Sequence, residues 1–350
     1  MLVITRRLAL TGLVAAAATP AALPALAQTA QITGAGASFP NPVYQRWGEG
    51  AKAAGIQLNY QSVGSGAGVN QIRNRTVDFG ATDAPLTQQQ LTEANLLQFP
   101  TVMGAVVPIV NIPGVETDQL RLTGEVLAEI YAGRITRWND PRIVEMNSGV
   151  TLPNLAIAPV YRADASGTSF VFTSYLSAVS ESWKNGAGAG TSVRWATGAG
   201  ARGNEGVAGT VRNTRGGIGY VENAYATQNR LATVQLRNKA GQYVKPTMET
   251  FQAAATNANW NAPGMAASII DQQGANSWPI VSPTFILLPT NPTDGAKTRA
   301  VMRFFDWAFT NGGNVARELE YVPLPQNVQA AVRSAWAGIR IDGQPAWPAR

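Results

Sequence analysis

Residues 157–172 read IAPVYRADASGTSFVF, an apolar run, a polar turn and a second apolar run. The first run, 157–161, predicts a buried strand, and Ser166 begins a helix candidate that extends to Trp183. The first amides of a helix have no intrahelical partner, and the helix dipole adds a positive end. A strand that leads into such a helix start is typical of α/β folds, and it offers a site for an oxyanion.

Arg162 stands at the beginning of this turn and supplies a planar guanidinium that suits phosphate or carboxylate. A purely structural interpretation is also available, in which Asp164 or Ser166 caps the helix and Arg162 pairs with Asp164. Taken alone, the turn favours the structural interpretation. Similar turns elsewhere in the chain shift the balance towards a binding site.

Two glycine-rich turns lie upstream. Residues 33–40 read TGAGASFP and precede a helix candidate, with Ser38 as its expected N-cap. Two glycines there suit the start of a dinucleotide fingerprint, but Phe39 occupies the place of the third, so a loop around a small anion is the better interpretation. Residues 64–68 read GSGAG and place Ser65 between a strand and a helix, although a plain glycine-rich turn explains them equally well.

A third upstream turn, residues 78–85, reads DFGATDAP. Asp83 is expected to end a strand and to cap the helix that Pro85 starts. The polar ends of strands gather at one edge of an α/β sheet, which is where such sheets bind ligands. Three such turns in one half of the chain and a fourth, with Arg162, in the other predict a binding cleft between two halves.

The composition excludes several classes of function. The 350 residues contain no histidine and no cysteine, which removes the commonest general base and metal ligand as well as the thiol nucleophile. We therefore expect no metal site and no cofactor. The formal net charge of +6 is mild and the basic residues are scattered, so we expect no nucleic-acid partner.

The N-terminus has the features of a secretory signal peptide. Arg6 and Arg7 precede an apolar run that ends in the small-x-small pattern of residues 25–27. We expect residues 1–27 to be cleaved and the mature chain to be a soluble periplasmic protein. Export by the general secretory route and export by the twin-arginine route both stay open.

Two long apolar runs divide the rest of the chain. Residues 102–112 and 280–288 predict buried strands on either side of a second α/β region, so the chain leaves one lobe and returns to it. Within that region, residues 186–204 are rich in Gly, Ala, Ser and Thr and predict a mobile surface loop. The expected lobes are residues 28–109 with 286–350, and residues 110–285.

Segments spanning essentially the whole mature chain resemble, in order, the substrate-binding proteins of ABC-type phosphate uptake systems. These segments are TGAGASFPNPVYQRW (33–47), NYQSVGSGAGVNQI (59–72), VDFGATDAPLT (77–87), QFPTVMGAVVPIVNIPG (98–114), RADASGTSFVFTSYL (162–176), GIGYVENAYA (217–226) and FFDWAF (304–309).

The resemblance implies a type II periplasmic binding protein with two lobes, each a mixed sheet flanked by helices, joined by two hinge crossovers and closing on its ligand. It implies that the protein is not an enzyme, that it binds inorganic phosphate in the cleft, and that it delivers phosphate to a membrane ABC permease. We expect a monomer. The phosphate contacts that carry over by matching motif positions are Ser38, Phe39, Ser65, Asp83, Arg162, Ser166, Gly167 and Thr168.

Asp83 is the unusual member of this set, since a carboxylate repels an anion unless the anion carries a proton. Phosphate keeps a proton at neutral pH and sulfate does not, so Asp83 is expected to accept that O–H and to exclude sulfate. Asp164 is expected to orient Arg162 rather than to touch the ligand. Gly66 departs from the family pattern, in which a second serine is frequent, and this departure affects at most a minor contact.

Two alternatives stay open. Arsenate shares the proton of phosphate, so a carrier of another protonated oxyanion would have the same site. A secreted serine hydrolase or phosphatase would use Ser65 or Ser166 as its nucleophile. Without histidine it needs a lysine or carboxylate base, and no Ser-x-x-Lys motif accompanies either serine.

Overall fold

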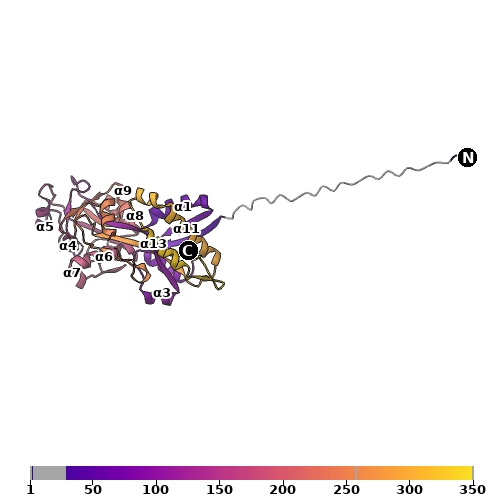
Figure 1. Cartoon of the computed structure of the whole chain (residues 1–350). Helices are drawn as coiled ribbons and strands as arrows, with labels where there is room; N and C mark the ends of the chain where they lie inside the picture. The colour runs from indigo at the N-terminus through magenta and orange to yellow at the C-terminus, as the bar shows by residue number, and fades with distance from the viewer. Residues whose placement is uncertain (1, 3–28, 257, 349–350) are drawn as a thin grey trace.

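The computed structural model describes residue 2 and residues 29–256 and 258–348. Figure 1 shows an elongated molecule in which the middle of the chain, in magenta and pink, forms one end, and the two terminal parts, in indigo and yellow, form the other. In this described part, no helix has both the length and the apolar composition that a membrane span requires. The predicted signal peptide, residues 1–27, lies outside the described residues apart from residue 2.

A large mixed sheet of 11 strands runs through the described molecule. Its strands are β1 (Ala30–Gly36), β2 (Ile56–Ser62), β3 (Phe79–Thr82), β4 (Leu96–Asn111), β6 (Ala158–Arg162), β7 (Ala199–Ala201), β8 (Gly217–Glu222), β9 (Ala232–Thr233), β12 (Ile269–Ile270), β13 (Ile280–Pro289) and β14 (Val322–Pro323). The main order is β2-β1-β3-β13-β4-β8-β6-β7, and the three remaining strands pair with β4 or β13.

Helices flank the sheet, and two small sheets lie apart from it. The α-helices are α1 (Asn41–Ala51), α2 (Ser65–Arg73), α3 (Gln88–Ala94), α4 (Gly124–Tyr131), α5 (Pro141–Val144), α6 (Gly167–Val179), α7 (Glu181–Asn185), α8 (Gly203–Asn213), α9 (Asn223–Asn229), α10 (Met248–Ala255), α11 (Gly295–Asn311), α12 (Gly313–Glu318) and α13 (Gln326–Trp336). Short 3-10 helices are η1 (Lys52–Ala54), η2 (Glu145–Asn147) and η3 (Pro263–Met265). The small sheets contain β5 (Arg121–Leu122), β10 (Gln235–Arg237) and β11 (Tyr243–Val244), and β15 (Arg340–Ile341) and β16 (Gln344–Pro345).

Each half of the molecule is built from strand-to-helix units. In one half, β1 leads into α1 and β2 into α2, and β1 pairs in parallel with both β2 and β3. In the other half, β6 leads into α6 and pairs in parallel with β7 and β8. This arrangement confirms the predicted α/β class with mixed pairing and flanking helices.

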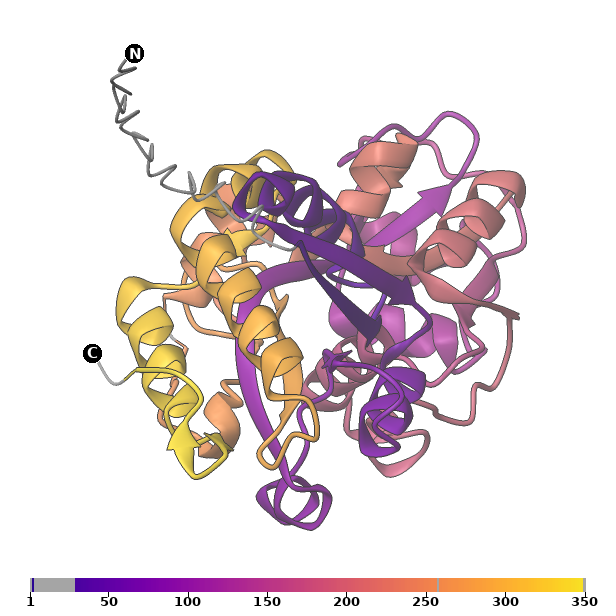
Figure 2. The same cartoon turned by 90° about the vertical axis from the view of Figure 1, so that its right-hand side faces the viewer.

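β4 is the strand that joins the two halves, and it is the long, curved purple strand of Figure 2. Residues 96–105 pair antiparallel with β13, whereas residues 106–111 pair antiparallel with β8. Almost every residue of β4 is buried, as its apolar sequence predicts. The strand begins six residues before the predicted position, because Asn95 adopts a left-handed conformation (φ 51°) that ends α3.

Aromatic side chains fill the core of each half. Phe305 of α11 packs edge-on against Phe79 and Phe99, with ring centroids 5.4 and 5.7 Å away. In the other half, the rings of Phe172 and Tyr220 stack with their centroids 4.2 Å apart. Residues 301–309 of α11 carry apolar side chains at helical spacing, and this stripe packs into the core.

Two expectations about the middle of the chain are wrong in part. The helix candidate of residues 166–183 is divided into α6 and α7, because Ser180 is extended and its Oγ accepts a hydrogen bond from the Trp183 N–H at 3.2 Å, capping a new helix. The expected irregular loop of residues 186–204 ends in regular structure, since it includes β7 and the first turn of α8. The glycine-rich composition of this stretch did not predict β7 or the start of α8.

Candidate functional site

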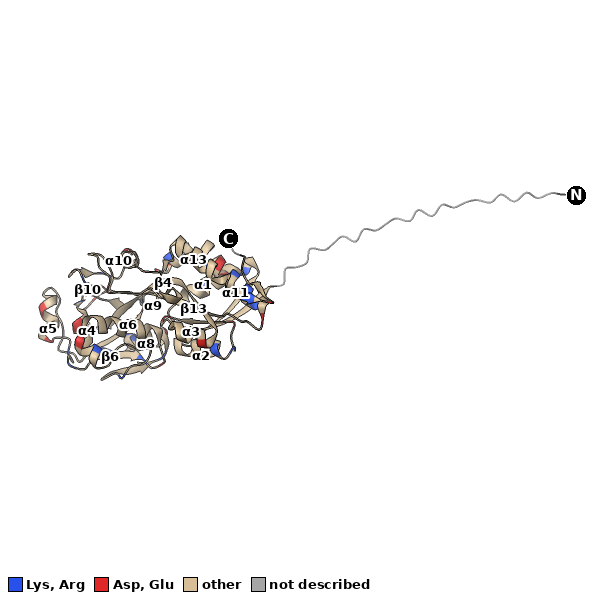
Figure 3. Ribbon diagram, turned by 60° about the horizontal axis from the view of Figure 1, so that its bottom comes forward, with Lys and Arg blue, Asp and Glu red and all other residues tan. Residues whose placement is uncertain are grey.

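The eight predicted contact residues lie where the two halves meet, and all are buried. They follow the ends of strands: the turn after β1, the start of α2, the turn after β3, the end of β6 and the first turn of α6. Figure 3 shows Lys and Arg positions scattered over both ends of the ribbon. The positive charge of this buried cluster comes from Arg162, whose side chain is 1% exposed.

Ser65 connects the two halves. Its Oγ accepts hydrogen bonds from the backbone N–H groups of Asp83 at 3.3 Å and of Gly167 at 3.1 Å. Next to it, the Gly66 N–H donates to the Ala165 carbonyl at 2.9 Å. A Cβ atom at position 167 would overlap both Asp83 Oδ2 and Ser65 Oγ, so the close approach requires glycine there.

Glycines on the other side of this contact are equally necessary. Gly64 has φ 94°, a left-handed conformation that side chains disfavour. A Cβ atom at Gly66 would lie 2.5 Å from the Cβ of Ala165. A serine at position 66, which the resemblance leads us to expect, would bring its Cβ against Ala165, so the glycine fits this tight contact.

Arg162 is held by a bidentate pair with Asp164. Nε donates to Asp164 Oδ1 at 2.8 Å and Nη2 to Oδ2 at 2.5 Å, while Nη1 donates to Thr168 Oγ1 at 3.3 Å. Burial alone raises the pKa of Asp164, but the hydrogen bonds and charge of Arg162, with the Gly203 N–H, hold it below its ordinary value. These contacts confirm that Arg162 pairs with Asp164; that Asp164 orients Arg162 towards a ligand stays a prediction.

Asp83 has a different environment. Its Oδ1 accepts a hydrogen bond from Thr284 Oγ1 at 2.8 Å, whereas Oδ2 is buried with no partner among the described residues. Burial raises the pKa of Asp83 to about 7, although the Thr284 hydrogen bond, the charge of Arg162 and the Ser65 hydroxyl oppose the rise. A buried carboxylate oxygen without a donor is costly, so Oδ2 is suited to accept a proton from a bound molecule.

The prediction that Asp83 caps a helix is wrong. α3 begins at Gln88, and Thr87 caps it by accepting a hydrogen bond from the Gln90 N–H at 3.2 Å. Local helix-cap preference suggested Asp83, but the tertiary contact with Thr284 determines where its side chain lies.

The prediction that Ser38 caps α1 is also wrong. Ser38 Oγ accepts hydrogen bonds from the backbone N–H of Asn204 at 3.1 Å and from its Nδ2 at 2.9 Å. Phe39, the next residue, is fully buried, and its carbonyl accepts a hydrogen bond from the Tyr321 hydroxyl at 2.6 Å. The turn after β1 is therefore fixed by residues that are far away in sequence.

Ser166 is a helix cap, as the structural interpretation predicts. Its Oγ accepts a hydrogen bond from the Ser169 N–H at 3.0 Å at the start of α6. The first turn of α6 places Gly167 and Thr168 directly after this cap, facing the contacts with Ser65 and Arg162. Ser166 can therefore cap α6 and also be a candidate ligand contact.

Sequence reasoning missed Asn204 and Thr284. Asn204 is fully buried and contacts both Ser38 and Thr168, and Thr284 is the partner of Asp83. One signal for Thr284 was available: it is a hydroxyl within the apolar run of β13, and a buried hydroxyl requires a partner. Asn204 had no such signal, because its neighbours are glycine-rich.

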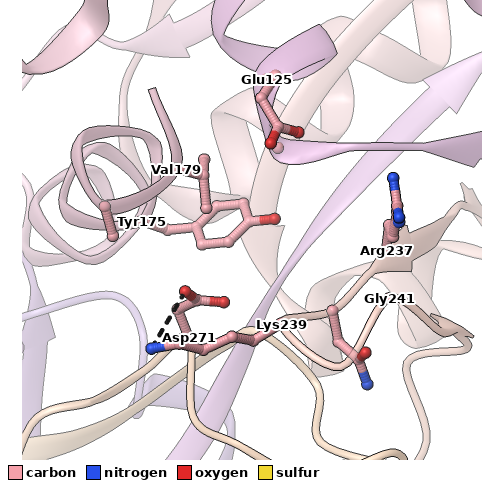
Figure 4. A pocket seen from close by; sticks show the side chains of 10 residues that line it. Glu125, Tyr175, Val179, Arg237, Lys239, Gly241 and Asp271 are labelled. Atoms are coloured by element: carbon pink, nitrogen blue, oxygen red, sulfur yellow. Dashed lines mark ion pairs between the residues drawn. The ribbon is translucent and has the colours of Figure 1, made fainter. Parts of the chain in front are cut away.

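A second polar region lies elsewhere. Figure 4 shows a cavity of about 410 Å³ whose labelled side chains include Glu125, Tyr175, Arg237, Lys239 and Asp271. Its one marked ion pair, between Lys239 Nζ and Asp271 Oδ2, is long at 3.9 Å. None of the predicted contact residues lines this cavity. It carries exposed charges of both signs, unlike the buried cluster around Arg162.

Comparisons with known proteins agree with this fold. A family model described as a PBP superfamily domain matches residues 23–311. The phosphate-binding protein PstS of Haemophilus influenzae is 49% identical over 312 residues, covering 89% of this chain and 93% of that protein. PstS of Pasteurella multocida is 50% identical over 317 residues, covering 90% and 92%.

Solved structures show the same architecture. A high-affinity periplasmic phosphate-binding protein, PfluDING, bound with phosphate, superposes with a TM-score of 0.71 at 22% identity, covering 89% of this chain and 96% of that one. A phosphate-binding protein from Stenotrophomonas maltophilia gives a TM-score of 0.67 at 20% identity, covering 89% and 96%. At such identities the likeness shows the fold alone, whereas the close sequence relatives show the family. This chain belongs to the PstS family of phosphate-binding proteins.

Proposed function

We propose that this protein binds inorganic phosphate between its two halves and delivers it to a membrane ABC permease. The observation that carries the proposal is the buried Asp83 Oδ2, which has no hydrogen-bond partner among the described residues. It lies in a cluster with the Arg162 guanidinium and with hydroxyl and amide donors. An anion that brings its own proton satisfies both the cation and the lone carboxylate oxygen.

Each proposed contact has a physical role. Arg162 supplies the charge that a dehydrated anion needs, because an unpaired buried charge costs several kcal/mol or more. Asp83 accepts the phosphate O–H and leaves sulfate facing a carboxylate with no proton between them. The remaining donors saturate the oxygens; they are Ser38, Ser65, Ser166 and Thr168 through their hydroxyls, Phe39 through its backbone N–H, and Gly167 through an N–H shared between the ligand and Ser65 Oγ.

We propose that the two halves are lobes that close around the ligand by a hinge motion. These lobes are residues 28–109 with 286–350, and residues 110–285. The hydrogen bonds from Gly167 to Ser65 and from Gly66 to Ala165 support this division, because they join the lobes directly beside the proposed site. Closing would then exclude water from the phosphate.

Export and delivery complete the proposal. Residues 1–27 would direct the chain to the periplasm and be removed, and the mature monomer would carry phosphate to the permease without a cofactor, a metal or a nucleic-acid partner. The curated relatives that match most of the chain carry the name phosphate-binding protein, which supports a role in uptake. Arsenate remains an alternative ligand because it offers the same proton.

We propose that the protein binds phosphate without catalysing a reaction. Ser65 Oγ accepts two backbone hydrogen bonds and Ser166 Oγ caps α6, and the chain has no histidine to remove a proton from either serine. A hydrolase would need a lysine or carboxylate base in its place. We expect no turnover of a chromogenic phosphate ester by the purified protein, and sustained turnover would favour the hydrolase.

Two measurements on the purified protein test phosphate binding. Native mass spectrometry of the protein as purified is expected to show an adduct of phosphate mass. Calorimetry after removal of the ligand is expected to give a Kd of about a micromolar or tighter, equivalent to roughly −8 kcal/mol. A protein that takes up no phosphate in either measurement would contradict the proposal.

A further inference from the structure

We propose that Asn204 is a positioning residue that turns the Ser38 and Thr168 hydroxyls into obligatory hydrogen-bond donors towards the ligand. The inference rests on the proposed phosphate site and deepens it. Asn204 lies in the first turn of α8 and is fully buried between Ser38, Thr168 and the backbone of Glu222. It acts through the two hydroxyls and is not itself proposed to touch phosphate.

Every polar group of the Asn204 side chain is used. Nδ2 donates to Ser38 Oγ at 2.9 Å and to Thr168 Oγ1 at 3.2 Å. Oδ1 accepts a hydrogen bond from the Glu222 N–H at 2.9 Å. The Glu222 N–H can only donate, so it fixes which end of the amide is the oxygen. Both Nδ2 protons must therefore point towards the hydroxyls.

Counting lone pairs then fixes the hydroxyl protons. A hydroxyl oxygen has one proton to donate and two positions that accept. Ser38 Oγ accepts from the Asn204 N–H at 3.1 Å and from its Nδ2. Thr168 Oγ1 accepts from Asn204 Nδ2 and from Arg162 Nη1 at 3.3 Å. With both accepting positions occupied, each hydroxyl can only donate, and an anion is the partner that such a group prefers.

Ser65 has the same arrangement without Asn204. Its Oγ accepts from the backbone N–H groups of Asp83 and Gly167, so its proton is also left to donate. The main chain alone fixes this hydroxyl. The other two depend on one buried side chain, which also links Ser38 in one half to Thr168 in the other.

A double-mutant cycle tests the inference by calorimetry with inorganic phosphate. Asn204→Ala is expected to weaken phosphate binding by about 30-fold or more, because two hydroxyl protons lose their fixed direction. In a background of Ser38→Ala with Thr168→Val, the same substitution is expected to cost less than about threefold, since the groups through which it acts are gone. A general loosening of the protein would cost the same in both backgrounds.

Two further variants complete the design. Asn147→Ala is the matched control, because the Asn147 side chain is also buried and its hydrogen bonds go to the backbone of Arg121 and Ile143, away from the site. It is expected to lower the melting temperature and to leave the phosphate Kd unchanged. If Asn204→Ala does not fold, the cycle uses Asn204→Asp, which keeps an acceptor for the Glu222 N–H and replaces the donor by an acceptor.

The outcomes separate the two proposals. Wild-type protein that binds phosphate, together with equal losses from the Asn204 substitution in both backgrounds, would overturn the positioning role and leave the proposed function standing. Unchanged affinity in Asn204→Ala would overturn it as well. Wild-type protein that binds no phosphate would overturn the proposed function itself.

Discussion

Two carboxylates from different regions of the molecule lie near the same arginine, and their surroundings are opposite. Asp164, in the turn after β6, has both oxygens bonded to Arg162, and its pKa is held low. Asp83, after β3, has one bond to Thr284, an unpaired oxygen, and a pKa raised by burial to about 7. The first carboxylate holds the arginine in a fixed position within the protein. The second is left for a ligand.

This difference explains how one site attracts an anion and still selects among anions. A bidentate pair fixes the guanidinium fork, so its geometry is set before a ligand arrives. An unsatisfied buried oxygen costs about 1–3 kcal/mol, and a protein gains nothing from that cost unless a ligand removes it. Asp164 therefore accounts for the orientation of the Arg162 guanidinium, and Asp83 accounts for the selection of phosphate over sulfate.

Replacing Asp83 by Asn is expected to have the largest effect of the changes considered. The amide no longer repels sulfate, so the preference for phosphate over sulfate should fall by about 1,000-fold from an initial preference of about ten-thousand-fold. Phosphate affinity should change much less, because the lost acceptor is offset by the lost negative charge. Calorimetry with both anions measures the two values.

The same substitution at the other carboxylate is the matched control for this experiment. Asp164→Asn leaves Asp83 in place and should preserve the preference for phosphate. An Asp83→Asn protein that still rejects sulfate as strongly as the wild type would refute the selective role of Asp83.

The pH dependence of sulfate binding is expected to be the next largest effect. Below its raised pKa of about 7, Asp83 carries a proton and can donate it to sulfate. Sulfate affinity should therefore rise by up to about tenfold per unit as the pH falls towards about 7 from above, and should level off below about 7, where Asp83 is already protonated. Competition titrations across this range measure the change, and the Asp83→Asn protein should show a flat profile. A wild-type profile without this rise would contradict the assigned protonation.

The smallest effect is expected for Asp164→Asn on phosphate affinity. Losing the bidentate partner loosens Arg162, but removing a negative charge near the anion strengthens attraction, so the net change should stay below about tenfold. The melting temperature should fall, because Arg162 is left buried without its counter-ion. A loss of phosphate binding as large as that from removing Arg162 would show that the two carboxylates do not have separate roles.

The sequence predicted the parts of this site that are local. Arg162, Ser166, Gly167 and Thr168 belong to one strand-to-helix turn, where the spacing of polar and apolar residues predicts both the fold and the start of a helix. The α/β class and the buried run that became β4 were predicted for the same reason. Periodicity and turn chemistry are properties of neighbouring residues.

The parts that were missed are contacts across long stretches of chain. Thr284 lies 201 positions from Asp83, and Asn204 lies 166 positions from Ser38. No local pattern reports such a pairing, so the local sequence suggested helix capping for Asp83 and Ser38, and that suggestion was wrong for both. Only the assembled sheet brings these residues together.

The most direct test of the central claim is calorimetry of the wild-type protein with phosphate and with sulfate under identical conditions, at about pH 8, where Asp83 is ionised. The account predicts micromolar or tighter binding of phosphate and sulfate binding weaker by about 100-fold or more. Equal affinity for the two anions would contradict it.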